Sequence, residues 1–246
     1  MMRIRIRFHK KGKVRFTSHR DVARIWDRAF RRTGIAVAYS QGFSPRQKLS
    51  FGLALSTGHE SEAEFLDVEV VDDRYRDREI WETDGVSTVA EVVEALNAVL
   101  PVGMDVVAVA PIEKGDSLQQ AVVACTWSMD VDDIGRADAE AWVAEVLSRA
   151  EIVVERERKG KSVIEDLRPH VHSLGVTGMT ETGVRLTADL GTQPRALRPS
   201  ELLAAVDPPL VARSVCRMNQ WTSQGTDREE PLMAPVAPAP PVKVPV

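Results

Sequence analysis

Arg3-Ile4-Arg5-Ile6-Arg7-Phe8 opens the chain with strict alternation, and Ser18-His19-Arg20-Asp21-Val22-Ala23-Arg24-Ile25-Trp26 follows after a polar, glycine-containing turn. Alternation of polar and apolar residues is typical of a strand with one buried face. In the second stretch Ser18 is a favourable helix N-cap, and the apolar residues recur at helical spacing. The two stretches therefore predict a strand and then a helix, which ends at Gly34.

The elements expected after this helix complete the first half of the chain. Apolar runs predict short strands at 35–39, 49–55 and 63–71, a helix at 88–100 and a strand at 104–112. The order of these elements is that of a ferredoxin-like βαββαβ domain with one additional short strand between the two helices.

A similar order recurs in the second half. We expect a strand at 121–131, a helix at 137–149, strands at 152–157, 163–174 and 183–190, a short helix at 199–206 and a strand at 210–218. The sequence thus predicts an α+β protein with two tandem ferredoxin-like domains, at 1–114 and 118–222. Six prolines in the last sixteen residues predict a disordered Pro-rich tail over 223–246.

Charge is distributed very unevenly along the chain. Residues 1–50 hold fourteen Lys and Arg against two acidic residues, a net charge of +12. The other 196 residues hold 18 basic and 34 acidic residues, a net charge of −16. Concentrated positive charge attracts polyanions, and nucleic-acid phosphates are the usual ones.

The first predicted helix presents much of this positive charge on one side. On a helical wheel its apolar residues share one side, and Arg20, Arg24, Arg28 and Arg31 lie on the other. A charged helix face is most often solvated. Here few acidic residues lie nearby to pair with the arginines, and unpaired like charges repel one another unless an anion sits among them.

A loop rich in Gly, Ser, Pro and basic residues is the second candidate contact region. Its backbone and its polar side chains could bind phosphate, and Phe43 could stack on a base. The alternative is an ordinary turn with Phe43 tucked into the core. The candidate nucleic-acid-binding residues of the helix, the loop and the approach to the helix are Arg15, Arg20, Arg24, Arg28, Arg31, Gly42, Phe43, Ser44, Arg46 and Lys48.

Other site types receive less support. His19 could act as a general base on a ribose 2′-OH, assisted by Tyr39 or Ser40, which would give a metal-independent endoribonuclease. His170 and His172 have a spacing that can hold a metal, but no third ligand is evident, so we predict no metal site. Glu60, Glu62 and Glu64 could be a solvated face, a cover for the arginines or acids in an active site, and the first two are favoured because alternation alone does not pair them with a base. No phosphate-loop, dinucleotide, nucleophile-elbow or zinc motif occurs.

Composition excludes further classes. No run of about 18 apolar residues occurs, and the N-terminus lacks the apolar core of a secretory signal, so we expect a cytoplasmic protein without membrane association. Cys125 and Cys216 are the only cysteines, which fits a reducing compartment and predicts small buried residues.

One spaced motif is specific enough to suggest a family. It reads Arg7-Phe8-x-Lys10-x-Gly12-x-x-Arg15-Phe16-x-Ser18-His19-x-Asp21-x-x-Arg24, and Arg28-Ala29, Arg31-Arg32, Gly42-Phe43-Ser44-Pro45 and Ser61-Glu62-Ala63-Glu64-Phe65-Leu66-Asp67 follow it. The motif resembles the radical-SAM-linked family of unknown function. The resemblance implies a companion of cobalamin-binding radical SAM proteins, sometimes encoded near a ribonuclease E/G. Two distant cysteines cannot hold a [4Fe–4S] cluster, so this chain is not itself expected to be a radical SAM enzyme and no cofactor is predicted in it.

These observations favour an RNA-binding or substrate-presenting accessory protein, without catalysis of its own, for a cobalamin-dependent radical SAM enzyme. Two alternatives remain open. One is the endoribonuclease using His19, and the other is an adaptor whose basic face docks an acidic partner, such as the radical SAM protein or a ribonuclease. A phosphorylated small molecule is a further possible ligand, because arginines bind any phosphate.

Overall fold

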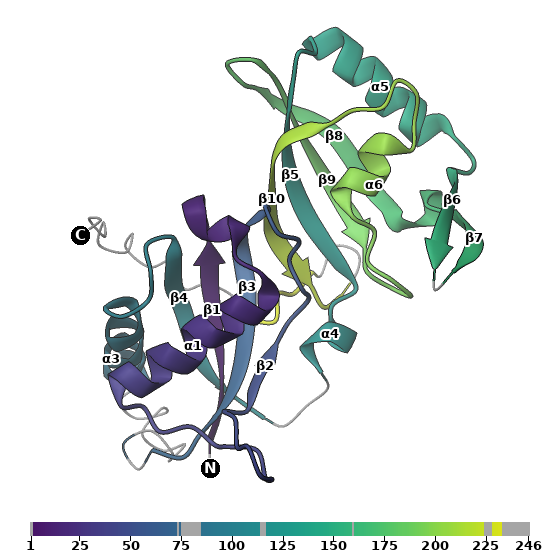
Figure 1. Ribbon diagram of the computed structural model, residues 1–246. Coiled ribbons are helices and arrows are strands. Elements are labelled where there is room, and N and C mark those ends of the chain that lie inside the picture. Colours follow the sequence, from purple (N-terminus) through teal and green to yellow (C-terminus); the bar gives the residue numbers. More distant parts are fainter. Residues whose placement is uncertain are drawn as a thin grey trace. The chain divides into compact units, whose positions relative to one another are not determined.

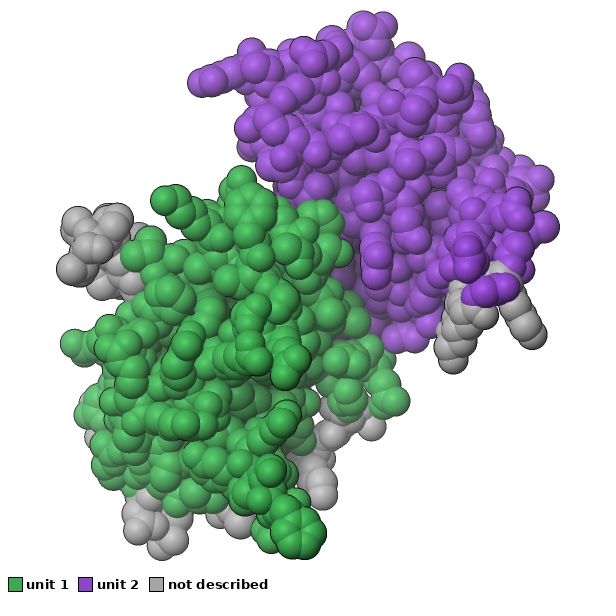
Figure 2. Space-filling view, viewed as in Figure 1, with its two compact units in different colours: residues 1–121, 229–246 green, residues 122–228 purple. Residues whose placement is uncertain are grey.

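The computed structural model describes residues 2–72, 74, 85–113, 117–158, 160–223 and 228–232. The chain forms two compact units (Figures 1 and 2), here called unit 1 and unit 2. Unit 1 comprises residues 1–121 and 229–246, and unit 2 comprises residues 122–228. For comparison, the sequence predicts domains at 1–114 and 118–222. No helix in the described ranges is both long and apolar enough to cross a membrane.

Unit 1 contains a four-stranded antiparallel sheet with the strand order β4-β1-β3-β2. Two helices cover one face of this sheet, and a short helix, α4, follows its last strand (Figure 1). The elements are β1 (Met2–Lys10), α1 (His19–Thr33), β2 (Leu49–Phe51), β3 (Glu60–Val70), α3 (Gly85–Asn97), β4 (Met104–Ile112) and α4 (Leu118–Ala121). A 3-10 helix at Gly12–Phe16 leads into α1.

The core of unit 1 follows from the alternation in β1. Ile4 and Ile6 lie opposite Val68 and Leu66 of β3, and all four side chains are buried. Trp26 of α1 completes this layer, with its ring centroid 5.0 Å from that of Phe8. The residues of β1 with odd numbers therefore point to the other face of the sheet.

Unit 2 repeats the arrangement with the strand order β10-β5-β9-β8. The separate β6–β7 hairpin is inserted between the first helix and the second strand of the sheet. The elements are β5 (Ala124–Asp132), α5 (Arg136–Ser148), β6 (Val153–Arg158), β7 (Lys161–Asp166), β8 (Val171–Met179), β9 (Gly183–Gly191), α6 (Pro199–Ala204) and β10 (Ala212–Trp221). Both units thus have ferredoxin-like strand order, and the α+β prediction is confirmed.

Two strand predictions are wrong in detail. Residues 35–39 form no regular strand, because Val37 and Tyr39 make single bridges to two different partners and the ladder does not propagate. The strand predicted at 163–174 is two strands, separated by a 3-10 helix at Arg168–His170. Pro169 lies in this interruption, where it supplies no backbone N–H to a ladder.

The predicted tail meets the structure only in part. Residues 224–227 and 233–246 lie outside the described residues. Residues 228–232 are described, and Glu230, Pro231 and Leu232 contact unit 1. The prediction of disorder over 223–246 therefore does not hold for these three residues.

Candidate nucleic-acid interface

Helix α1 is positioned by caps that the sequence specifies. The hydroxyl of Ser18 accepts a hydrogen bond from the backbone N–H of Asp21 at 3.2 Å, which satisfies one of the free donors at the helix start. Gly34 ends the helix in a left-handed conformation with φ of 69°, which a residue with a side chain rarely adopts. The buried stripe of Val22, Trp26 and Phe30 fixes the rotation of the helix. Its arginines consequently face solvent.

The arginines of α1 are all exposed, and the acidic residues of the same helix neutralise them unevenly. Arg24 pairs with Asp21 at 2.9 Å, and Arg31 pairs with Asp27. The hydrogen bond from Ser18 lowers the pKa of Asp21, and Arg24 and Arg20 lower it further, so this acid stays charged at neutral pH. Within the described part of the chain, neither Arg28 nor Arg32 has an ion pair or a hydrogen bond through its side chain. Two of the four arginines of the predicted ridge, Arg24 and Arg31, are therefore neutralised by acids of the helix, whereas Arg20, Arg28 and the neighbouring Arg32 make no ion pair among the described residues.

The loop after α1 is held at its base and exposed at its tip. The hydroxyl of Ser40 accepts from the backbone N–H of Arg46 at 3.0 Å, and the backbone N–H of Ser40 donates to the carbonyl of Arg46 at 2.8 Å. Gly42 has φ of 131°, a conformation that favours glycine. Phe43 at the tip is fully exposed, so the alternative that placed it in the core is wrong.

An exposed phenylalanine needs an explanation, because leaving such a side chain in water forgoes about 1.5–3 kcal/mol of burial free energy. In the same loop, the guanidinium of Arg46 makes no ion pair or hydrogen bond with the described residues. Tyr39, at the base of the loop, interacts with Arg31 and raises its pKa together with Asp27, which is the larger cause. The loop therefore lies beside the C-terminal end of α1.

Ser44 is exposed in the loop, and the last two candidates, Arg15 and Lys48, have acidic partners. Arg15 pairs with Glu60 at 3.0 Å, and Lys48 lies 3.5 Å from Glu69. Glu62 pairs with Lys11 and lies 3.1 Å from His9. Glu60 and Glu62 thus bind the cations Arg15 and Lys11, which lie between β1 and α1, and neither is paired with an arginine of α1.

His19 lies at the opposite end of α1 from Tyr39. His19 and Arg31 are twelve positions apart, which corresponds to about 18 Å of helix, so Tyr39 cannot share a proton with His19. The neighbours of His19 are instead Phe51, whose ring centroid is 5.1 Å away in an edge-to-face contact, and a small depression lined also by Lys10 and Glu64. Sequence reasoning missed Lys10 and named Glu64 without placing it near His19, because β1 and β3 bring these residues to the helix from 9 and 45 positions away.

Lys10 is buried, and its ammonium group donates to the carbonyl oxygens of Arg15 and Thr17 at 3.4 and 3.0 Å. These bonds fix the turn that enters α1. Lys10 therefore has a structural task whether or not the depression binds anything.

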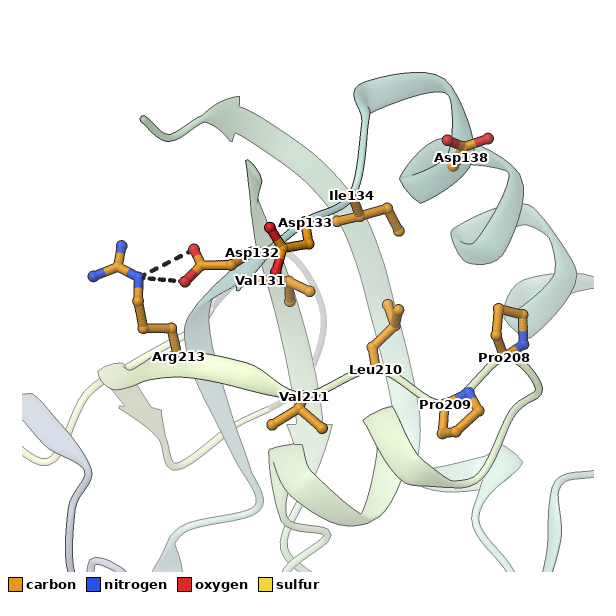
Figure 3. A pocket seen from close by; sticks show the side chains of 10 residues that line it. All are labelled: Val131, Asp132, Asp133, Ile134, Asp138, Pro208, Pro209, Leu210, Val211 and Arg213. Atoms are coloured by element: carbon orange, nitrogen blue, oxygen red, sulfur yellow. Dashed lines mark hydrogen bonds and ion pairs between the residues drawn. The ribbon is translucent and has the colours of Figure 1, made fainter. Parts of the chain in front are cut away.

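Unit 2 contains an open pocket of about 570 Å³ that the sequence did not suggest. Figure 3 shows its lining, with Arg213 of β10 paired to Asp132 of β5 at 3.0 Å and with Asp138 entering from α5. Apolar residues of the segment before β10 form another side, among them Leu210 and Val211. A hydrogen bond from Thr182 lowers the pKa of Asp132, and Arg213 lowers it further, so its charge balances that of Arg213.

The histidine pair and the cysteines of unit 2 lie apart from these sites. A Cβ on Gly191 would lie 3.2 Å from one nitrogen of His170 and 3.2 Å from one nitrogen of His172, so both rings face this glycine. Among the described residues no group of three or more His, Cys, Asp or Glu side chains is arranged to hold a metal ion. Cys125 is buried on β5, and Cys216 is half-buried on β10.

A protein-family model covers most of this architecture. The model described as "Uncharacterized protein conserved in bacteria (DUF2344)" matches residues 3–199, which include the whole candidate interface. The chain belongs to this family. No curated protein matches the chain.

Among solved structures, the DUF2344 chain is similar to a chain of the "Crystal Structure of a Cbf5-Nop10-Gar1 Complex". The sequence identity is 9% and the TM-score is 0.46. The match covers 88% of this chain and 48% of the other, so this chain spans about half the length of that one. Similarity at this level carries no information about function.

Proposed function

We propose that this protein binds RNA through the exposed arginine face of α1 and the loop that carries Phe43, as a non-catalytic subunit that holds or presents the RNA. The observation that carries the proposal is the fully exposed Phe43 in the loop that also holds Arg46, at the end of α1 where Arg28 and Arg32 make no ion pair with the described residues. Cations that track the backbone, together with an aromatic ring that stacks on a base, are the two components of single-strand recognition.

A salt titration tests the electrostatic part. The full chain is mixed with a labelled single-stranded RNA, and the affinity is measured from 50 to 300 mM salt. Because each phosphate contact on a single strand contributes about −0.7 to the slope of log K against log salt, Arg28→Ala with Arg32→Ala should reduce the slope by about 1.4. An unchanged affinity and slope would rule out the proposed surface.

The matched control is Arg136→Ala with Arg149→Ala, which removes two surface arginines at the ends of α5 in unit 2. This variant has the same change of net charge. It should bind RNA with the slope of the unaltered protein, so a loss in both variants would indicate unspecific attraction.

The finer proposal concerns the partner. The resemblance to companions of cobalamin-binding radical SAM proteins supports an accessory role in RNA modification or processing. Affinity purification of the full chain from cells, with and without nuclease, separates the alternatives. A radical SAM protein or a ribonuclease E/G that is lost on nuclease treatment is bridged by RNA, whereas one that survives would favour the adaptor.

A second candidate function is cleavage of RNA by His19. It is favoured by the depression that gathers His19, Lys10 and Glu64, where an imidazole lies close to both a cation and a carboxylate. Cleavage in EDTA that is abolished by His19→Ala would support it. Intact RNA after prolonged incubation with the full chain would exclude cleavage, and RNA binding would remain as the proposed function.

A further inference from the structure

The sheet of unit 1 has a second face, which is built from charged as well as apolar residues. Arg3, Arg5 and Arg7 of β1 alternate with the residues that enter the core under α1 and α3. Phe65 and Asp67 of β3 lie directly opposite Arg7 and Arg5 in the register. This face, away from the two helices, is called the arginine face of the sheet.

Two of its three arginines are neutralised within the sheet. Arg5 binds the buried carboxylate of Asp67 with two nitrogens, at 2.7 and 2.9 Å. Arg3 reaches the same carboxylate at 3.3 Å. Asp67 thus neutralises Arg3 and Arg5, and Arg7 has a different acidic partner.

That partner comes from the far end of the chain. Arg7 forms an ion pair with Glu230 and donates to the carbonyl oxygen of Leu232 at 3.2 Å. Its guanidinium also lies 5.7 Å from the centre of the Phe65 ring, within cation–π range. A residue 223 positions away in sequence therefore supplies the counter-charge.

The next two residues of the segment are also recognised. The carbonyl oxygen of Pro231 accepts a hydrogen bond from Arg5 at 3.0 Å. The side chain of Leu232 packs against a small apolar cluster formed by Ala63, Phe65 and Leu118. Glu230, Pro231 and Leu232 thus contact a cation, a hydrogen-bond donor and an apolar surface, respectively.

The Arg7–Glu230 ion pair is more deeply buried than an ordinary surface contact. The side chains of Arg7 and Glu230 retain 8% and 5% of their exposure. Removing two charges from water is unfavourable unless they meet a specific partner, so a connecting segment would ordinarily keep its carboxylates in solvent. The arginine face of the sheet has the composition of a binding site for an acidic residue, a proline and an apolar residue in sequence.

We propose that the arginine face of the sheet is a peptide-binding site, and that the Glu230-Pro231-Leu232 segment of this chain is its resident ligand. The site lies on the face of the sheet away from α1, so the proposal is independent of RNA binding. A tethered ligand competes at an effective concentration on the order of millimolar, and the site is therefore closed to an added peptide until the segment is released.

The test uses full-length variants and a labelled synthetic peptide, Arg-Glu-Glu-Pro-Leu-Met-Ala, that copies residues 228–234. Glu230→Ala with Leu232→Ala removes both anchors of the resident segment. Fluorescence polarisation should show saturable binding of the peptide to this variant, and binding at least about tenfold weaker to the unaltered chain. Glu91→Ala with Val102→Ala changes a glutamate and an aliphatic residue at exposed positions of unit 1 and should behave like the unaltered chain.

Specificity is tested from both sides. A peptide with Gln in place of the glutamate that corresponds to Glu230 should bind the double variant about tenfold more weakly, because the charge-assisted hydrogen bond is lost. Adding Arg7→Lys to the double variant should weaken binding similarly, since lysine lacks the planar fork of arginine. Circular dichroism confirms that each variant is folded, and Glu230→Gln alone replaces the double variant should that one unfold.

A folded variant with a released segment that does not bind the peptide would overturn the proposal. Equal binding of the Glu and Gln peptides would overturn it as well, because the site would then not recognise the carboxylate.

Discussion

The arginines of β1 and those of α1 come from the same basic stretch of sequence, yet the fold uses them in opposite ways. Arg5 and Arg7 are largely withdrawn from solvent and bind Asp67, Glu230 and backbone carbonyl oxygens. Arg28 and Arg32 project into solvent and make no ion pair or side-chain hydrogen bond with the described residues. The comparison teaches that the net charge of a sequence segment overstates the charge available to a ligand, because acidic residues distant in sequence neutralise part of it.

The largest expected effect is on stability, from a single arginine of β1. Arg7→Ala removes the cation of a nearly buried ion pair, which costs at most about 3–5 kcal/mol, because release of the Glu230 segment into solvent limits the loss. Arg28→Ala should change the free energy of unfolding by less than about 0.5 kcal/mol, because it is an exposed residue outside any network. Urea unfolding measures the loss of stability in each variant. Equal midpoints would show that the arginines of β1 and α1 do not differ in their contribution to stability.

The next effect is on RNA affinity without a change in stability. Phe43→Ala should weaken binding of a single-stranded RNA by about 1–3 kcal/mol, the usual contribution of one aromatic–base stack. Its melting temperature should remain that of the unaltered chain, because the ring buries no area in the folded protein. Phe16→Ala, which removes another exposed phenylalanine of unit 1, is the matched control. Similar losses in both variants would show that Phe43 has no special role.

A smaller effect concerns the anchor of the segment that leads to the loop. Asp72 accepts hydrogen bonds from the backbone N–H of Ala36 and from Arg74, and these bonds, those from Arg74 first, lower its pKa to about 2. Because the folded-state pKa is depressed, the stabilisation is complete above about pH 4 and is lost as the pH falls towards 2. Asp72→Asn should therefore be less stable by on the order of 1 kcal/mol at pH 5, after allowance for solvent screening.

Unfolding curves of the two proteins at pH 5 and pH 2.5 check this sign. The stability difference between them should shrink at the lower pH. A difference that stays constant or grows would show that the Asp72 carboxylate does not anchor the segment.

The smallest effect should come from freeing one cation of α1. Asp27→Asn releases Arg31 from its ion pair, and exposed pairs of this type contribute about 0.2–1 kcal/mol. RNA affinity should rise by up to about fivefold at low salt, and the gain should vanish at 300 mM salt. Weaker binding at low salt would mean that the Arg31–Asp27 pair itself takes part in recognition.

Much of the fold could be predicted from the sequence, because its signals are local. Ser18 and Gly34 delimit α1, and alternation in β1 identifies its buried face. The predictions that fail depend on distant partners. Residues 35–39 look extended, yet whether they join a sheet is decided by Val70 and Gln47.

Some features of the candidate site could likewise be predicted from local sequence, and others could not. The rotation of α1 follows from its apolar stripe, so the exposure of its arginines could be predicted. The exposure of Phe43 could not, because a glycine-rich loop permits either orientation. The pairing of Arg7 with Glu230 joins residues 223 positions apart, and no local pattern indicates it.

The most direct test of the central claim is to crosslink RNA to the purified full chain with ultraviolet light and to map the modified peptides by mass spectrometry. The account predicts that crosslinks concentrate at Phe43 and in the peptides of α1, and that β1 and unit 2 remain unmodified. Crosslinks that lie mainly in β1 or in unit 2, or their absence from the loop at concentrations where RNA is bound, would contradict it.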